Sequence, residues 1–531
     1  MGSRRQQLKV ERLQHRAGLG ISAVSHQGAS ITSPQLASWL PLRASADADL
    51  LPELGTLVSR SRDLTRNNGI ATSGVQTLVD NVVGVGLRLS ALPDYRALGK
   101  TVEWAMEWQR KTERLFREWS TDTNCDAAQE LNFAGLTELM FRNQVGDGDA
   151  IALPLWMRRP GSRFGTCLQV VESDRLSNPD NRMDDATLRG GIERDGYGAP
   201  VAYHIRKTHP GDYLLGVASV ASAVGQWERI PARTAWGRKR VIHLHDKERT
   251  GQSRGKPVMS AVIQQFKMLD KYAGAELDAA VINAMMAAFI ETEMSGDALV
   301  ELFGSPENMN KVVAQRNQGR PRLKSGSIIP LYPGEKMQPF MPARPAAQFE
   351  AFTVAVMRHI AAAMGLPYEL LLKDFSKTNY SSARAALLEA WRMFRSRREK
   401  LATYWAQPCY ELWLEEAINT GLIEAPDFYE NRAAYCRTKW IGPGRGWVDP
   451  VKEAQAAQIR MNAGISTLEA ECAEQGLDWE EVLEQRAREL KRMQELGIDP
   501  ASMATVAPVT FVEHQNVKGA NDDGQDASGA A

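Results

Sequence analysis

The sequence lacks an excess of charge of either sign. Its 531 residues include 64 Lys and Arg and 64 Asp and Glu, so the formal net charge at pH 7 is zero. A protein that binds nucleic acid over its whole surface is usually basic, and a disordered chain is poor in apolar residues. Because 43% of this chain is hydrophobic, it is globular, and a nucleic-acid surface has to be sought in local charge.

Cysteine is scarce, and long apolar runs are missing. The five cysteines stand at no telling spacing, which excludes a disulfide framework or a zinc-binding cysteine cluster and favours a reducing compartment. The N-terminus, MGSRRQQLKVERLQHR, has no apolar core of a signal peptide. The longest apolar run, 279–290, is too short to span a membrane and contains Asn283. We expect a soluble intracellular protein of about three or four compact units.

Catalytic motifs are also missing. The sequence contains no GxxxxGK[ST] phosphate loop, no GxSxG and no HExxH. Gly84-Val85-Gly86 lacks a third glycine, so a turn into a strand is a better interpretation than a dinucleotide loop. His243-Leu244-His245 with Asp246 offers metal-ligand types, but a strand would place both imidazoles on one face for ordinary polar reasons, and no third ligand stands at a telling spacing. We therefore predict no catalytic site, no metal and no cofactor.

In the first half of the chain, the apolar pattern predicts helices followed by short strands. Residues 1–50 are expected to be weakly ordered, and 54–83 to form two helices joined at Asn67-Asn68-Gly69. Further helices are predicted at 102–119 and 133–144, and strands at 150–156, 167–171, 191–193, 201–205 and 241–244. Residues 213–227 cannot be assigned.

Helices dominate the second half. A long helix is predicted at 258–290, and after a proline-rich segment a second one at 349–364, ended by Gly365-Leu366-Pro367. A third is predicted at 381–406, where Pro408 has to kink or end it. The remaining predictions are a helix at 410–419, two or three helices between 450 and 496, and a solvated tail of about thirty residues. The whole pattern indicates an α+β protein.

Local charge is uneven along this neutral chain. Residues 307–336 contain six basic and two acidic side chains, 373–400 contain eight and three, and 469–495 contain four and nine. A charge run is usually a solvated face, but two basic segments on either side of one helix fit contacts with a phosphate backbone, which need cations and no base-reading geometry.

The helix predicted at 381–406 has two faces. Its apolar side chains recur at helical spacing and are expected to be buried as core: Leu387, Trp391, Phe394, Leu401 and Trp405. Its basic side chains are expected to stay outside: Arg392, Arg395, Arg397 and Arg398.

Three stretches of the chain resemble portal proteins of lambda-type tailed phages and prophages. The family's N-terminal signature resembles residues 61–91, SRDLTRNNGIATSGVQTLVDNVVGVGLRLSA. Its most recognisable block resembles residues 379–398, NYSSARAALLEAWRMFRSRR, which follow MGLPYELLLKDFS. Its C-terminal helical region resembles residues 449–489, DPVKEAQAAQIRMNAGISTLEAECAEQGLDWEEVLEQRARE. The matches keep the family's order and cover roughly residues 50–498.

The resemblance implies an α+β portal fold in a ring, typically a homododecamer, at one capsid vertex. Such a ring passes double-stranded DNA without sequence specificity, docks the terminase large subunit, later receives head-completion and connector proteins, and contacts the capsid protein. It implies no enzymatic activity and no membrane, and places the chain in the virion after assembly in the host cytoplasm. The alternatives are a DNA-processing enzyme or packaging motor subunit, and a monomeric scaffolding or adaptor protein.

The family's architecture also divides the chain. It implies, in order, a flexible segment 1–50, a mixed α/β wing 51–256, a first stem helix 257–290, a small α/β clip 291–346, a second stem helix 347–365, a tunnel-loop region 366–380, a returning wing part 381–449, a helical crown 450–498 and a disordered tail 499–531.

Two groups of candidate site residues follow from this division. Those expected to contact the DNA backbone in the channel are Lys373, Lys377, Asn379 and Tyr380. Those expected to bind an acidic patch on the terminase or a connector protein are Arg316, Arg320, Arg322 and Lys324. The acidic C-terminal region would keep DNA from sticking in the channel.

Overall fold

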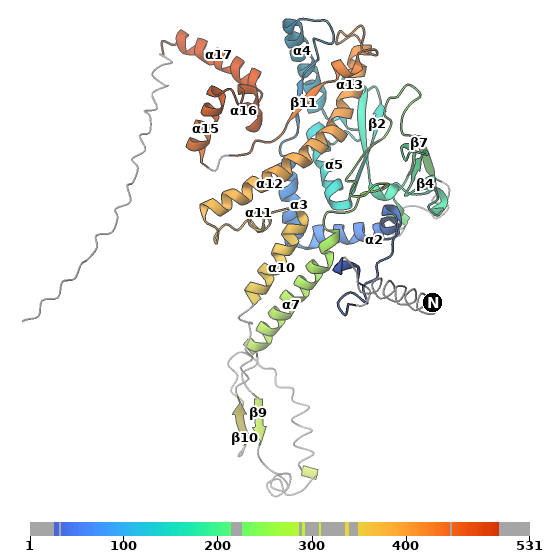
Figure 1. Cartoon of the computed structure of the whole chain (residues 1–531), viewed down its shortest axis with the longest axis vertical. Helices are drawn as coiled ribbons and strands as arrows, with labels where there is room; N and C mark the ends of the chain where they lie inside the picture. The colour runs from blue at the N-terminus through green and yellow to red at the C-terminus, as the bar shows by residue number, and fades with distance from the viewer. Residues whose placement is uncertain are drawn as a thin grey trace, which may run out of the picture. The chain divides into compact units, whose positions relative to one another are not determined.

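The computed structural model describes residues 26–30, 33–213, 226–285, 289–292, 307–308, 335–338, 349–446 and 449–498. It divides into two compact units, residues 1–440 and 441–531 (Figure 1). The α-helices of the first unit are α2 (Ala46–Asn67), α3 (Gly69–Val82), α4 (Val102–Thr121), α5 (Phe133–Asp147), α7 (Ile263–Met285), α10 (Phe349–Met364), α11 (Tyr368–Leu372), α12 (Tyr380–Leu401), α13 (Gln407–Asn419) and α14 (Arg432–Tyr435).

The boundary between α2 and α3 confirms the prediction of two helices joined at Asn68. The Asn68 side chain accepts hydrogen bonds from the N–H groups of Ile70 and Ala71, both at 3.0 Å, and its own N–H donates to Leu64 O. One residue thus ends the first helix and caps the second. The first helix begins at Ala46, capped by Ser45, earlier than the expected start of order near residue 50.

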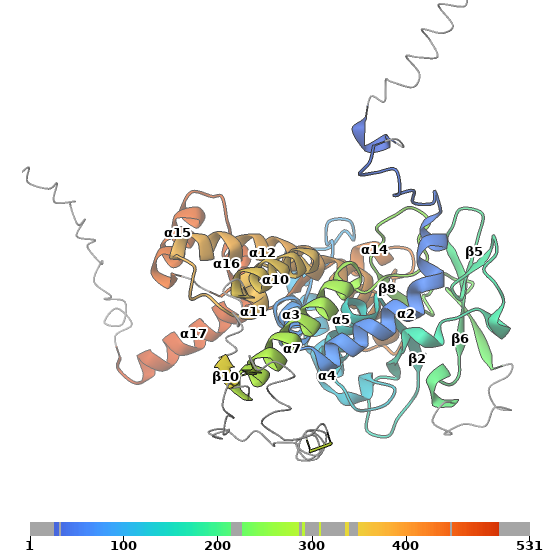
Figure 2. The same cartoon turned by 90° about the horizontal axis from the view of Figure 1, so that it is seen from below.

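The strands form small antiparallel sheets. They are β1 (Arg88–Ala91), β2 (Asp149–Trp156), β3 (Thr166–Val171), β4 (Leu188–Arg189), β5 (Ile192–Arg194), β6 (Pro200–Arg206), β7 (Trp227–Pro231), β8 (Ile242–His245), β9 (Phe289–Thr292), β10 (Glu335–Gln338) and β11 (Thr438–Ile441). One sheet has the order β3-β2-β8 and another β4-β5-β6-β7, while β1 pairs with β11 and β9 with β10. Figure 2 shows the four-stranded sheet beside β2. All five predicted strands are present.

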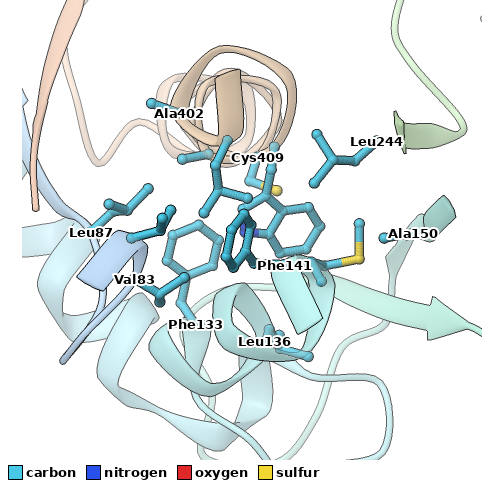
Figure 3. Close-up of a cluster of buried hydrophobic side chains, with 14 of the residues drawn as sticks. Val83, Leu87, Phe133, Leu136, Phe141, Ala150, Leu244, Ala402 and Cys409 are labelled. Atoms are coloured by element: carbon cyan, nitrogen blue, oxygen red, sulfur yellow. The ribbon is translucent and has the colours of Figure 1, made fainter. Parts of the chain in front are cut away.

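The main hydrophobic core lies between the helices and the three-stranded sheet. In Figure 3, Phe133, Leu136 and Phe141 of α5 face Ala402 and Cys409 from the α12–α13 region. The Trp405 ring stacks on the Phe133 ring with 5.8 Å between centroids. A smaller cluster, which includes Ile151, Tyr203 and Ile230, joins the two sheets.

Pro408 neither ends nor sharply breaks the long helix. A π-helical turn, Ala402–Ala406, connects α12 to α13, and Pro408 occupies the first turn of α13. Proline has no N–H, and its ring clashes with the carbonyl four residues earlier in a regular α-helix. The wider π turn accommodates the proline and lets the chain remain helical, contrary to the predicted kink or end.

The helix predicted at 258–290 is shorter than expected. After a 3₁₀ turn, Ser260–Val262, α7 ends at Met285, and Phe289–Thr292 forms β9, in which Ile290 pairs with Met337 of β10. The aromatic and β-branched residues of this strand favour the sheet over the helix. The helix predicted at 349–364 is confirmed as α10, which lies beside α7 (Figure 1). No helix among the described residues is both long and apolar enough to span a bilayer.

The described part of the second unit contains three helices, in agreement with the predicted two or three. They are α15 (Pro450–Asn462), α16 (Leu468–Glu474) and α17 (Trp479–Glu495). The side chains of Asp449, Thr467 and Asp478 cap their N-termini. Arg460 donates two hydrogen bonds, at 2.9 and 2.7 Å, to Glu471 and joins α15 to α16.

Candidate functional site

The polar loop 373–379 is held between two helices that are anchored on α3. Leu371 of α11 is buried, and its carbonyl accepts a hydrogen bond from Ser73 Oγ at 2.8 Å. A Cβ on Gly74 of α3 would lie 2.5 Å from Met364 Cε and 2.9 Å from Leu371 Cδ1, so a larger residue would require these two flexible side chains to move. The loop therefore extends from helices that pack against α3, which is the arrangement expected of a loop that contacts a partner.

Lys373 begins this loop and is exposed. Its backbone is left-handed, with φ of 56°, and its N–H donates to Glu369 O to end α11. Within the described residues, its ammonium group forms no ion pair. Asp374 stabilises the turn that follows, because its side chain accepts hydrogen bonds from Ser376 N at 3.0 Å and Ser376 Oγ at 2.7 Å.

Lys377 forms an ion pair with Glu350 of α10. This contact raises the pKa of Lys377 and lowers that of Glu350. The two side chains are 78% and 71% exposed, so solvent screens the pair and it adds little stability. In this conformation, the carboxylate of Glu350 offsets the charge of Lys377.

Asn379 caps the N-terminus of α12. Its side-chain oxygen accepts hydrogen bonds from Ser382 N at 2.8 Å and Ser382 Oγ at 2.6 Å. The helix itself needs this oxygen, whereas the side-chain amide N–H₂ group remains available for an acceptor such as a phosphate. The Tyr380 side chain lies outside the described part of the structure.

Substitution of Asn379 by Ala will lower the free energy of unfolding by about 1 kcal/mol, because the first turn of α12 loses its cap. Urea unfolding followed by tryptophan fluorescence measures this effect. Lys377→Met is the control from the same loop and is expected to unfold like the unsubstituted protein, because its ion pair is solvent-exposed. Equal stability of both variants would show that the cap is not needed.

The α12 arginines do not all stay outside as predicted. Arg392 and Arg395 are exposed, but Arg397 and Arg398 are half-buried. Arg398 donates to Asn81 O at 2.8 Å and Val82 O at 3.1 Å, where α3 ends. Burial, with a smaller effect from Arg395, lowers the pKa of Arg398 to about 10. The apolar face is confirmed in part: Phe394, Leu401 and Trp405 are buried, whereas Leu387 and Trp391 are only half-buried.

The predicted docking residues cannot be placed in the same way. They lie outside the described residues: Arg316, Arg320, Arg322 and Lys324. Their assignment stays a prediction.

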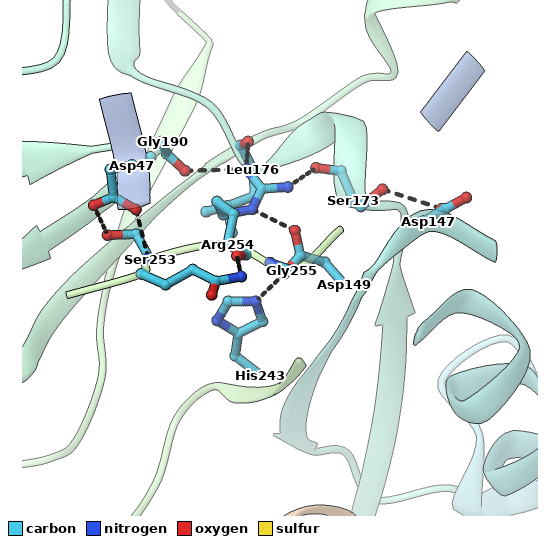
Figure 4. A network of polar contacts seen from close by, with 12 residues as sticks. Asp47, Asp147, Asp149, Ser173, Leu176, Gly190, His243, Ser253, Arg254 and Gly255 are labelled. Carbon is cyan, nitrogen blue, oxygen red and sulfur yellow. Dashed lines mark hydrogen bonds and ion pairs between the residues drawn. The ribbon is translucent and has the colours of Figure 1, made fainter. Parts of the chain in front are cut away.

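A buried polar network surrounds Asp149 at the start of β2 (Figure 4). Asp149 Oδ1 accepts hydrogen bonds from His243 Nε2 and Gly255 N, both at 2.8 Å, and Oδ2 accepts one from Arg254 Nε at 2.6 Å. Burial opposes ionisation of this carboxyl, but the charge of Arg254 and the hydrogen bond from His243 bring its pKa below the usual range. Asp149 is therefore a buried, ionised and fully paired carboxylate.

Arg254 extends the network to two further segments (Figure 4). It donates to the carbonyls of Leu176 at 2.7 Å, Ser173 at 3.0 Å and Gly190 at 3.1 Å. Its neighbour Ser253 donates through N and Oγ to Asp47 of α2, both at 2.7 Å. The segment that leads into α7 is thus tied to a helix, a strand and two loops. The sequence does not reveal this network, because Arg254 and Asp149 are 105 residues apart.

Two glycines allow this segment to lie against the end of α5. Gly148 adopts φ of 90°, a conformation that favours glycine. A Cβ on Gly255 would lie 1.9 Å from Gly148 O, so no larger residue fits without movement of the backbone.

His243 and His245 lie on the same face of β8, as predicted, while Ile242 and Leu244 are buried on the other. Their rings stack with 4.2 Å between centroids. Neither ring nitrogen of His245 has a hydrogen-bond partner among the described residues, and both are buried. Burial, reinforced by His243, lowers the pKa of His245 to about 3.

The carboxylate that lies beside the two imidazoles does not belong to Asp246, the acidic residue of the local sequence motif. Asp246, which follows the histidines in sequence, pairs instead with Lys400 at 2.7 Å. The group beside the imidazoles is Asp149, 94 residues before His243. A local motif could not reveal it.

Comparison with known proteins gives consistent matches. The family profile described as "Phage portal protein, lambda family" matches residues 32–398. The portal protein of Escherichia phage N15 is 31% identical over 95% of this chain and 96% of its own length. Portal protein B of Escherichia phage lambda is 31% identical over 91% of this chain and 92% of its own. A chain in the neck of an empty gene transfer agent particle is similar with 17% identity and a TM-score of 0.45, over 79% of this chain and 93% of that one.

Proposed function

The chain belongs to the lambda family of phage portal proteins, and from this premise we propose that its copies form the ring-shaped DNA channel at one capsid vertex. In this proposal, a ring of typically twelve copies assembles with the capsid protein in the host cytoplasm and remains in the virion. The genome passes through it during packaging and ejection. The terminase large subunit docks on it first, and head-completion or connector proteins follow.

The observation that carries the proposed DNA contact is the exposed loop between α11 and α12. Within the described residues, Lys373 has no ion-pair partner, and neither have the exposed Arg384 and Arg395 farther along α12. Unpaired cations on a rigid base suit a partner that offers phosphates and is not read by sequence. Lys377 would have to leave Glu350 to join them, so we assign the leading contact to Lys373.

Exposed apolar side chains on α7 and α10 support association into a ring. Met268, Leu277 and Val281 of α7 are 58%, 66% and 50% exposed, and Phe352 of α10 is 49% exposed. Apolar side chains gathered on two adjoining helices favour a protein partner. In a closed ring, the neighbouring copy supplies such a partner for every subunit.

The proposed clip residues complete this function. Arg316, Arg320, Arg322 and Lys324 would form a basic surface for an acidic patch, first on the terminase and later on a connector protein. Opposite charges on two surfaces speed their encounter and set their register.

Simultaneous Lys373→Met and Lys377→Met substitutions will lower the yield of DNA-filled particles by at least about tenfold, because each lost phosphate contact is repeated around the ring. The measurement is the DNA content of particles made in a packaging system with each variant as the sole portal. Lys400→Met is the matched control, since Lys400 lies on α12 outside the loop and pairs with Asp246.

Electron microscopy of the same preparations must show rings for both variants. Rings with unchanged DNA content in the double variant would contradict the proposed loop contact. Monomers of the unsubstituted protein would favour the scaffolding alternative, and nuclease or ATPase activity would favour the enzyme or motor alternative.

A further inference from the structure

Three metal-ligating side chains meet on one face of the β2–β8 pair. In the antiparallel register, Asp149 lies opposite His245, and His243 lies opposite Ile151. Residues two apart on a strand share a face, so both imidazoles stand beside the carboxylate. One ligand atom from each of the three residues lies within 4.8 Å of the others. We propose that Asp149, His243 and His245 form a binding site for a divalent transition-metal ion.

The donor set decides the class of ion. Two imidazole nitrogens and one carboxylate oxygen suit Zn²⁺ and its neighbours in the first transition row, whereas Ca²⁺ and Mg²⁺ prefer oxygen ligands. Three protein ligands leave a tetrahedral position for water. The site therefore takes Zn²⁺ or Co²⁺, and both ions serve as probes.

The two buried nitrogens of His245 are the strongest indication of a ligand. A buried polar atom without a partner is costly, and such groups usually bond to protein, water or an ion. Every other polar side chain of the network is satisfied by a neighbour: Asp149, His243 and Arg254 all form hydrogen bonds. His245 alone in this cluster is held in place without a bonding partner among the described residues.

The network already orients the carboxylate for this role. Arg254 donates to Oδ2 of Asp149 and Gly255 N donates to Oδ1, and outer contacts of this kind position the ligands of metal sites. Binding would replace the hydrogen bond between His243 Nε2 and Asp149 Oδ1. His243 Nε2 binds an ion only without its proton, so the ring proton then resides on Nδ1.

The charge of Arg254 limits the affinity. Its guanidinium repels a divalent ion, although Asp149 stands between them and compensates one charge. We therefore expect micromolar rather than tighter binding. An ion at this site would join β8 to β2 beside the segment 253–255, and so stiffen the junction between the sheet and α7.

Cobalt and zinc titrations of the purified full-length chain test the proposal. After treatment with a chelator under reducing conditions, the protein is expected to bind one Co²⁺ per chain with a visible d–d absorption band, which Zn²⁺ displaces. His245→Leu is expected to weaken binding by at least about tenfold. His245 donates no hydrogen bond to the fold, so this variant should fold. His359→Leu, which removes an exposed histidine of α10, is the matched control and should bind normally.

Three results would overturn the proposal. They are the absence of saturable binding, equal affinity in the His245→Leu variant, and a thiolate-to-cobalt charge-transfer band that assigns the ion to cysteine. If the network is purely structural and binds no ion, His245→Leu would stabilise the protein equally with and without Zn²⁺. Thermal unfolding with and without the ion separates the two cases, and neither result depends on DNA packaging.

Discussion

Replacement of Arg254 by Met will lower the free energy of unfolding by about 3–5 kcal/mol, because it leaves the ionised Asp149 buried without its partner. The two side chains are 6% and 1% exposed. The substitution also removes the hydrogen bonds that Arg254 donates to the carbonyls of Ser173, Leu176 and Gly190. Urea unfolding of the purified chain at fixed protein concentration, followed by tryptophan fluorescence, measures the change.

Arg249→Met is the matched control for this experiment. Arg249 lies five residues earlier and pairs with Asp49, but it is 53% exposed, so its removal is expected to cost less than about 1 kcal/mol. Asp149→Leu combined with Arg254→Met should be more stable than Arg254→Met alone, because no unpaired charge is then buried. Equal costs for Arg254→Met and Arg249→Met would contradict the anchoring role of the network.

Substitution of Trp405 by Ala will cost about 3–5 kcal/mol of the free energy of unfolding, the range for loss of a large buried aromatic. Trp405 is fully buried, stacks on Phe133, and donates from Nε1 to Thr137 Oγ1 at 2.9 Å. It thus joins the π-helical turn between α12 and α13 to α5. Urea unfolding followed by circular dichroism measures the loss without relying on tryptophan fluorescence.

Two further variants identify what Trp405 contributes. Tyr404→Ala removes a 56% exposed aromatic from the same π turn and is expected to change the stability by less than about 1 kcal/mol. Trp405→Phe keeps an aromatic ring against Phe133 but loses the hydrogen bond to Thr137, so its cost should be intermediate. A Trp405→Ala variant as stable as Tyr404→Ala would contradict this packing.

Local patterns predicted most helices of this protein well. The predicted 349–364 and the observed α10 have the same bounds, and the break at Asn68 is correct. Helical periodicity and caps involve residues a few positions apart, so a sequence displays them directly. The errors occur where distant segments compete for a residue. Phe289–Thr292 became a strand because β10 pairs with it.

In the candidate sites, too, the sequence predicted features that depend on neighbouring residues but not contacts between distant ones. The exposed start of the loop at Lys373 followed from its place between two predicted helices. The ion pair of Lys377 with Glu350 did not, because it joins residues 27 positions apart. Likewise, Arg398 is half-buried only because the end of α3 lies beside α12. Exposure of a basic side chain depends on what packs against its helix.

The sequence by itself determined most of the helices, much of their apolar faces and, through three long matching stretches, the portal family of this chain. Only the tertiary structure placed Asp149 beside His243, His245 and Arg254. The pairing of β2 with β8 brings the two histidines to Asp149, and the segment 253–255 contributes Arg254. Helix formation is decided within a few residues, whereas a buried charge is stabilised by whichever partners the complete fold brings within hydrogen-bond distance. Those partners lie about a hundred positions away in the chain, as the separations of 94 and 105 residues from Asp149 show.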